Sequence, residues 1–71
     1  MHKFSKVTFI GFGLINSSLA HVFKLKSLAK ETNAFSRRNE TREKIKNLNI
    51  VDNVNDNIKE SVKDSDLIVL G

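Results

Sequence analysis

The feature that most constrains this 71-residue chain is a short apolar run that meets two closely spaced glycines and then a helical pattern. The run is Val7-Thr8-Phe9-Ile10, and Gly11 and Gly13 follow it. β-Branched and aromatic residues favour a strand, and glycine permits a tight turn after it. From Leu14 onward, apolar residues recur at spacings of three and four, which predicts an amphipathic helix that runs to about Leu28. These residues are Leu14, Ile15, Leu19, Val22 and Phe23, with Ala20 between them.

A second strand and a second helix are predicted further along the chain. Thr32–Phe35 is a brief β-prone stretch, and polar residues follow it. Asn39 can cap a helix there, because its side-chain oxygen can accept a hydrogen bond from a free amide of the first turn. Ile45 and Leu48 supply an apolar face for this helix. Asn49 would end it, since asparagine tolerates the left-handed backbone conformation that commonly closes a helix.

The last third of the chain predicts a short strand, a third helix and a final strand. Asp56 is a candidate cap for the third helix, which carries Ile58 and Val62 at a spacing of four. Leu67–Leu70 is apolar on both alternating faces, which is typical of a central strand covered by helices on both sides. The order predicts an α/β fold with a parallel sheet and helices on both faces, rather than a bundle or barrel.

Composition excludes several other ways of building a small domain. The chain has no cysteine and only two histidines, His2 and His21, so neither disulfides nor a zinc site is expected to stabilise it. We interpret His21 as a surface or packing residue of the first helix. No apolar run approaches the roughly 20 residues of a membrane span, and no signal sequence is evident, so we expect a soluble, cytoplasmic protein with no membrane partner.

The net charge of +4 is unevenly distributed along the sequence. Residues 1–30 carry five lysines and no acidic residue. A basic surface of this kind attracts anions, which include nucleic acids and small phosphorylated molecules. The lysines are scattered and no aromatic or arginine-rich recognition motif accompanies them, so most are interpreted as solvated surface. A nucleic-acid partner is the least favoured of the functions considered.

The segment Gly11-Phe12-Gly13-Leu14-Ile15-Asn16 matches the dinucleotide-binding pattern G-x-G-x-x-G at its first two glycines. Gly11 permits the turn, and Gly13 removes a side chain where a pyrophosphate would approach the backbone. The free amides that open the helix form an anion site. Asn16 stands where the third glycine is usual, and its side chain would either push the helix outward or turn toward the phosphates. The alternative interpretation is that these glycines merely end a strand.

The end of the second strand distinguishes between cofactors in such folds. An acidic residue there binds the ribose hydroxyls of NAD, whereas arginine accommodates the additional phosphate of NADP. Here the sequence is Ser36-Arg37-Arg38, and Ser36 lies 36 − 16 = 20 residues after Asn16. A hydroxyl and two guanidinium groups suit a phosphate monoester, which predicts NADP rather than NAD. The alternative is an exposed basic turn beside Glu40 and Glu43.

The run from Val7 to Ala20 resembles the opening of the prephenate and arogenate dehydrogenases. Those enzymes typically show Ile-Gly-x-Gly-Leu-Ile-Gly followed by small residues, and the pair Leu14-Ile15 is the specific part of the match. The resemblance continues through the Ser36-Arg37-Arg38 segment, Asn49-Ile50-Val51-Asp52 and the stretch from Asp64 to Leu70. It departs from the family at Asn16 and Asn49, where glycine is usual.

The resemblance implies an NADP-dependent oxidoreductase of tyrosine biosynthesis that oxidatively decarboxylates prephenate or arogenate, with hydride transfer to the cofactor. The family's catalytic histidine and substrate-binding arginines lie beyond the position that matches Gly71. We therefore expect residues 1–71 to be the N-terminal part of a dinucleotide-binding Rossmann domain, truncated after the fourth strand. The catalytic and helical dimerisation regions would be absent, so neither catalytic nor metal-binding residues are expected. The expected cofactor-binding residues are Gly11, Phe12, Gly13, Leu14, Ile15 and Asn16 at the pyrophosphate, Ser36, Arg37 and Arg38 at the adenosine phosphate, and Leu70 and Gly71 at a ribose.

Two alternative functions remain open at the level of sequence. The chain could be a non-catalytic NADP-binding module, or part of another NADP-dependent oxidoreductase, such as a reductase of pyrroline or hydroxyacid substrates. Within the resembling family, prephenate and arogenate are not distinguished. An uncovered apolar strand at Leu67–Leu70 also predicts concentration-dependent self-association, as a homodimer.

Overall fold

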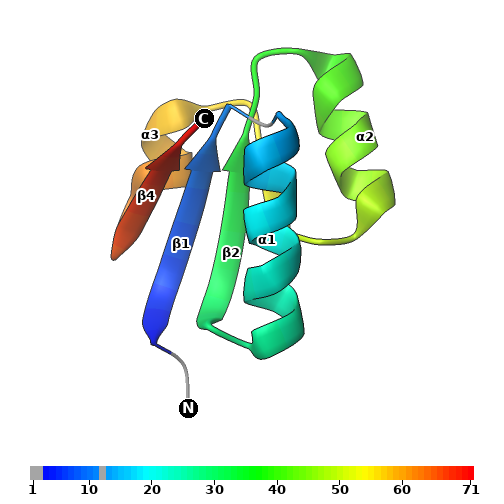
Figure 1. Cartoon of the computed structure of the whole chain (residues 1–71). Helices are drawn as coiled ribbons and strands as arrows, with labels where there is room; N and C mark the ends of the chain where they lie inside the picture. Colours follow the sequence, from blue (N-terminus) through cyan, green and yellow to red (C-terminus); the bar gives the residue numbers. More distant parts are fainter. Residues whose placement is uncertain (1–2, 12) are drawn as a thin grey trace.

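Strands and helices alternate along the chain in the predicted order, and all strand pairs are parallel (Figure 1). The computed structural model describes residues 3–11 and 13–71. Phe12, an expected cofactor-binding residue, lies outside the described residues, as do His2 and the side chains of Leu14 and Ile15. The sheet order is β3-β2-β1-β4. The predicted partial α/β, Rossmann-like fold is confirmed. Its elements are β1 (Phe4–Ile10), α1 (Leu14–Lys26), β2 (Ala29–Phe35), α2 (Asn39–Leu48), β3 (Asn53–Asn55), α3 (Ile58–Val62) and β4 (Leu67–Leu70).

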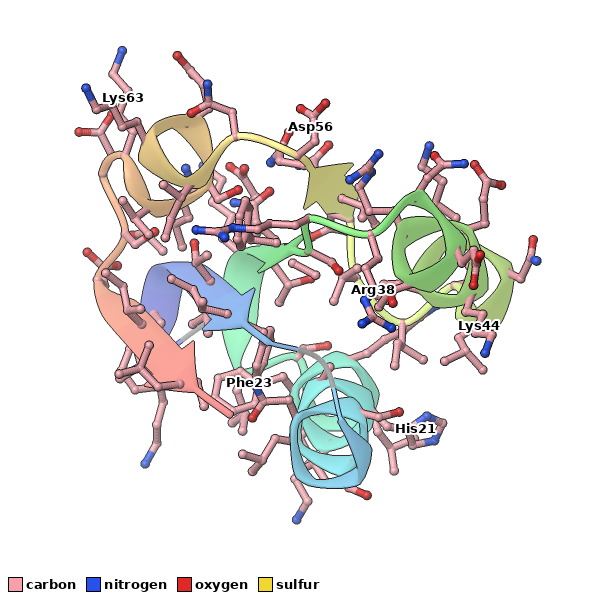
Figure 2. The ribbon with its side chains drawn as sticks, turned by 90° about the horizontal axis from the view of Figure 1, so that it is seen from above. His21, Phe23, Arg38, Lys44, Asp56 and Lys63 are labelled. Atoms are coloured by element: carbon pink, nitrogen blue, oxygen red, sulfur yellow. The ribbon has the colours of Figure 1, made fainter. Side chains whose placement is uncertain are left out.

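One face of the sheet carries the apolar core and is covered by α1 and α2, while α3 lies on the opposite face (Figures 1 and 2). Val7 and Phe9 of β1 are fully buried on the apolar face, together with Ala20 of α1. Phe23 of α1 meets Phe9 edge to face, with ring centroids 5.8 Å apart, and stacks on Phe4 at 6.0 Å. Aromatic pairs in these geometries stabilise packing beyond their buried area. They hold α1 against β1.

The face beneath α3 is polar where it is buried. Side chains alternate between the two faces of a strand, so Thr8 lies opposite to its neighbours Val7 and Phe9. Its hydroxyl donates to the carbonyl of Ser61 at 2.6 Å, and it lies 2.6 Å from the hydroxyl of Ser65. A buried polar group needs such partners, because an unpaired one is costly. α3 is therefore attached to the sheet through hydrogen bonds.

Strands β1 and β2 both begin three residues before their predicted starts at Val7 and Thr32. The additional residues at the start of each strand include polar ones, such as the paired Lys6 and Glu31. A search for runs of apolar residues therefore does not detect them as part of a strand. Parallel pairing uses backbone groups, so it continues through polar side chains. Helix α1 ends at Lys26 rather than near Leu28, because the next residue has a left-handed backbone with φ of 51°.

Two of the three predicted helix-capping residues are wrong. Arg38, not Asn39, is the N-cap of α2, and its side chain makes no capping hydrogen bond. Asn57, not Asp56, is the N-cap of α3, and its side-chain oxygen accepts from the amide of Glu60 at 3.1 Å. At both helix starts, a residue of a type that commonly caps helices lies next to the actual N-cap residue. The sequence therefore locates each helix start only to within one residue. The left-handed Asn49 that ends α2 is confirmed, with φ of 54°.

The buried side of α1 differs from the predicted one. Leu19 and Val22 were expected to face the core, but they are 37% and 39% exposed. The inner side is instead formed by Asn16, Ala20 and Phe23, at spacings of four and three. The side of α1 that faces the sheet therefore includes a buried asparagine and not only apolar residues. Asn16 is accommodated there because its amide donates hydrogen bonds at the end of β1. His21 is exposed, in agreement with its interpretation as a surface residue.

Strand β4 was predicted to be central and is an edge strand in this sheet, because it pairs with β1 alone. Leu67 and Val69 pack against the core, whereas Ile68 and Leu70 are 45% and 77% exposed. The apolar pattern on both faces does not by itself reveal whether a further strand or helix covers the second face. Among the helices of residues 3–11 and 13–71, none has the length and apolarity needed to cross a membrane.

Candidate functional site

Strand register brings three predicted site segments to one edge of the sheet. Ile10, the last residue of β1, pairs with Phe35 of β2 on one side and with Leu70 of β4 on the other. The residues that follow these three strands therefore leave the sheet side by side, on strands about 5 Å apart. They are Gly11, Ser36 and Gly71.

The same edge contains the topological switch point of the sheet. From β1 the chain winds outward through β2 to β3, and it then returns to place β4 on the other side of β1. Ligands of open α/β sheets bind in the crevice at the carboxyl ends of the strands where this reversal occurs. Gly11, the first residue of the segment 11–13 that we call the glycine turn, directly follows β1 and therefore lies at that position.

Gly11 is required by the backbone of this turn. Its φ is +75°, a conformation that L-residues with a side chain adopt only at a cost. A Cβ atom at this position would lie 2.9 Å from the carbonyl oxygen of Gly71, which is too close. The amide of Gly71 in turn donates to the carbonyl of Ile10 at 2.9 Å. The ends of β1 and β4 are thus joined too tightly for any larger residue at Gly11.

Gly13 differs from Gly11, because the protein itself does not require a glycine there. It is the N-cap of α1 in an extended conformation, and no described residue other than its chain neighbours has an atom within 4 Å of the place where a Cβ would be. As the N-cap, Gly13 has no side chain that could cap α1, and the first turn of this helix contains no acidic residue. The free amides and the positive end of the helix dipole therefore favour an anion. The open space at Gly13 is where such an anion could approach the backbone.

The side chain of Asn16 points into the protein, toward the end of β1. It is 1% exposed, and its Nδ2 donates to the carbonyl of Gly11 at 2.6 Å and, more weakly, to that of Ile10 at 3.4 Å. A Cβ at Gly71 would lie 2.5 Å from this nitrogen. Its Oδ1 is buried and has no hydrogen-bond partner among the described residues. The side-chain amide of Asn16 therefore holds the start of the glycine turn at the end of β1.

The segment after β2 forms a compact turn with its charged groups outside, which we call the basic turn (residues 36–38). The amide of Ser36 donates to the carbonyl of Asn55 at 3.3 Å, and the amide of Arg38 donates to Ser36 Oγ at 3.3 Å. Arg37 and Arg38 are exposed. Seen along the strands from their carboxyl ends, Arg38 lies over the space between α1 and α2 (Figure 2).

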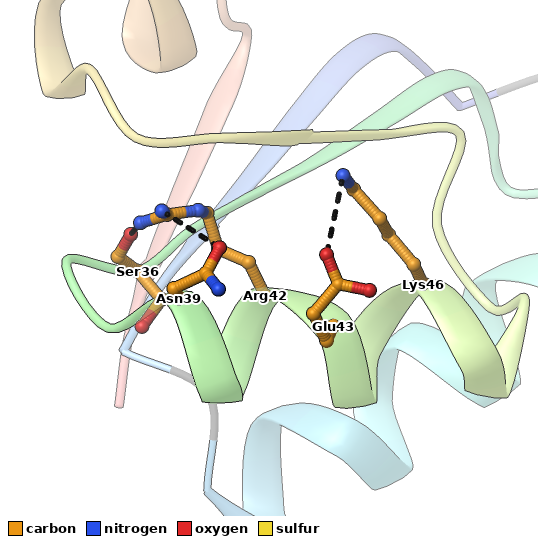
Figure 3. Close-up of polar contacts among 5 residues, drawn as sticks. All are labelled: Ser36, Asn39, Arg42, Glu43 and Lys46. Atoms are coloured by element: carbon orange, nitrogen blue, oxygen red, sulfur yellow. Dashed lines mark hydrogen bonds and ion pairs between the residues drawn. The ribbon is translucent and has the colours of Figure 1, made fainter.

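Within the described part of the chain, no carboxylate neutralises the basic turn. Glu43 lies 4.0 Å from Lys46, with which it forms an exposed ion pair (Figure 3). The guanidinium groups of Arg37 and Arg38 make no ion pair with a described residue. Because the turn directly precedes the N-terminus of α2, the helix dipole adds to its positive potential.

Arg42 is a site residue that sequence reasoning missed. It lies on the first turns of α2, and its Nη1 donates to the carbonyls of Ser36 at 2.8 Å and Arg37 at 3.0 Å. Its Nη2 donates to Asn39 Oδ1 at 3.3 Å (Figure 3). In sequence, Arg42 is one of several charged residues on a polar helix. Nothing in the pattern distinguishes a guanidinium that folds back on the preceding turn from one that is solvated.

The remaining predicted residues are an exposed Leu70 at the end of β4 and Gly71 against Asn16. No group of three His, Cys, Asp or Glu side chains that could hold a metal ion occurs among residues 3–11 and 13–71. The geometry defines a partial Rossmann-like α/β unit with a glycine turn at its switch point and a basic turn beside it. The sequence matches no protein-family model, and no curated protein is significantly similar to it.

Proposed function

We propose that this chain is the cofactor-binding segment of an NADP-dependent oxidoreductase. The observation that carries the proposal is the basic turn at the end of β2, adjacent to the glycine turn at the end of β1. The two guanidinium groups carry no carboxylate partner among the described residues. An acidic residue, which would favour the ribose hydroxyls of NAD, does not occupy this position.

Each part of the site would bind one part of the cofactor. The phosphate on the adenosine ribose would bind Ser36, Arg37 and Arg38, because arginine donates paired hydrogen bonds to phosphate oxygens. The pyrophosphate would lie against Gly13 and the free amides of α1. Leu70 and Gly71 would border a ribose. When bound, NADP supplies the acceptor for a hydride.

For the reaction, we propose oxidative decarboxylation of prephenate or arogenate, as the sequence resemblance implies, and we propose the cytoplasm as its location. The support is the pair Leu14-Ile15 after the glycine turn, together with the Ser36-Arg37-Arg38 segment. Reading the gene past the codon for Gly71 tests this part. A helical second domain, with NADP-dependent oxidation of either substrate by the full-length product, is expected. NADP binding without oxidoreductase activity would instead favour a non-catalytic module.

Cofactor preference tests the proposal directly on this chain. We expect NADP to bind at least about tenfold more tightly than NAD, because one charge-assisted hydrogen bond is worth roughly 1.5 to 3 kcal/mol. The measurement is a calorimetric titration of both cofactors, repeated with a twentyfold excess of duplex or single-stranded oligonucleotide. Displacement by the oligonucleotide, or tighter binding of NAD, would contradict the proposal.

We also propose that the chain associates with itself in a concentration-dependent way. The exposed Ile68 and Leu70 lie on an edge strand, and such edges pair readily with other strands. Sedimentation velocity over a range of protein concentrations measures this. We expect the average mass to rise toward a dimer, and a monomer at every concentration would exclude the association.

A further inference from the structure

Arg42 holds the basic turn from the side of α2. The Nη1 atom of its guanidinium donates to two consecutive carbonyls, that of Ser36 at 2.8 Å and that of Arg37 at 3.0 Å. Its Nη2 is occupied by Asn39 Oδ1. The terminal nitrogens of this guanidinium thus have partners within the protein, in contrast to the exposed groups of Arg37 and Arg38. Arg42 is therefore placed to shape the turn rather than to bind a ligand itself.

The direction of the two carbonyls determines where the neighbouring amides point. The peptide bond is planar, and in the trans form its N–H points away from its C=O. Because the described chain contains no cis peptide bond, the amides of Arg37 and Arg38 point away from the Arg42 guanidinium. The amide of Arg38 donates to Ser36 Oγ, so the hydroxyl lies on that same outward side. With its oxygen serving as an acceptor, the hydroxyl can still donate its own hydrogen outward.

We infer that Arg42 is a positioning residue for phosphate recognition, an inference that rests on the proposed binding of NADP at this turn. By fixing two carbonyls inward, it presents the Ser36 hydroxyl and the amide of Arg37 on the side from which a phosphate monoester would approach. Arg42 would thus determine the preference for NADP over NAD without contacting either cofactor.

The test compares two charge-neutralising changes on the same helix. Arg42→Gln removes the contacts to both carbonyls, whereas Lys46→Gln removes an equal charge one turn later from an exposed side chain. We expect Arg42→Gln to weaken NADP binding about fivefold to tenfold and to leave NAD binding unchanged. Lys46→Gln should change neither affinity by more than about twofold, because an exposed charge is largely screened. Equal losses of NADP binding in both variants would overturn the inference in favour of a long-range charge effect.

A second measurement separates this inference from the proposed function. Amide hydrogen exchange of the cofactor-free protein is expected to accelerate at Ser36 and Arg38 in Arg42→Gln, and to stay unchanged in Lys46→Gln. Unchanged exchange in Arg42→Gln would disprove the positioning role even if NADP binds. If the wild-type chain binds no NADP, the proposed function fails, while faster exchange would still show that Arg42 holds the turn. An equal loss of NADP and NAD binding with a lower unfolding temperature would reduce Arg42 to a purely structural role.

Discussion

Replacing Gly11 with alanine is expected to lower the free energy of unfolding by about 2 to 4 kcal/mol, while the same change at Gly13 leaves stability within about 0.5 kcal/mol. At Gly11 two costs add. The backbone has φ of +75°, and a Cβ would lie 2.9 Å from the carbonyl oxygen of Gly71, which is a backbone atom and not the movable end of a side chain. At Gly13 the backbone is extended and the space around the missing Cβ is open.

The same two substitutions distinguish an effect on NADP binding from an effect on the stability of the fold. A methyl group at Gly13 would occupy space that the pyrophosphate needs, so Gly13→Ala should weaken NADP binding about tenfold or more at unchanged stability. Denaturant unfolding followed by circular dichroism gives the stabilities, and calorimetric titration gives the affinities. If Gly13→Ala binds NADP as the wild type does, the pyrophosphate does not bind at the start of α1. If Gly11→Ala is as stable as Gly13→Ala, the tight junction between β1 and β4 is not needed by the fold.

Sequence reasoning predicted the elements of this fold because each has a local signal. The apolar run Val7–Ile10 before a glycine and the run Leu67–Leu70 mark two strands, and Asn49 marks a helix end. The errors lie where the signal is weak or shared by neighbours. Polar strand residues such as Lys6 and Glu31 are paired through their backbones. Their side-chain types therefore do not indicate that they belong to a strand.

Within the site, the glycines were predictable and the residues that hold the two turns were not. Gly11 and the Ser36-Arg37-Arg38 segment follow strand ends in the sequence, so the topology of a parallel sheet brings them together. The inward direction of Asn16 depends on the carbonyls of the glycine turn, which it meets only after α1 packs on β1. Arg42 contacts residues five and six positions earlier, and those contacts depend on the angle between the turn and α2. Such contacts are set by tertiary geometry, which composition and spacing do not encode.

Replacing Arg37 with alanine is expected to weaken NADP binding about 10-fold to 100-fold and to leave NAD binding almost unchanged. The guanidinium is exposed and makes no ion pair with a described residue, so its loss should remove only contacts to a ligand. The backbone carbonyl of Arg37, which accepts from Arg42, is retained in alanine. The basic turn should therefore keep its shape, and the unfolding midpoint should stay where it is.

A series of substitutions at Arg37 shows whether this residue contributes two parallel hydrogen bonds to the phosphate or only its positive charge. Arg37→Lys keeps the charge but cannot donate two parallel hydrogen bonds, so its NADP affinity should fall between those of the wild type and Arg37→Ala. Lys44→Ala, an equal loss of charge at an exposed position on α2, is the matched control and should have little effect. Titrations at two salt concentrations complete the comparison, because a direct phosphate contact is screened less than a distant charge. Equal losses of NADP and NAD binding in Arg37→Ala would mean that the adenosine phosphate does not bind at the basic turn.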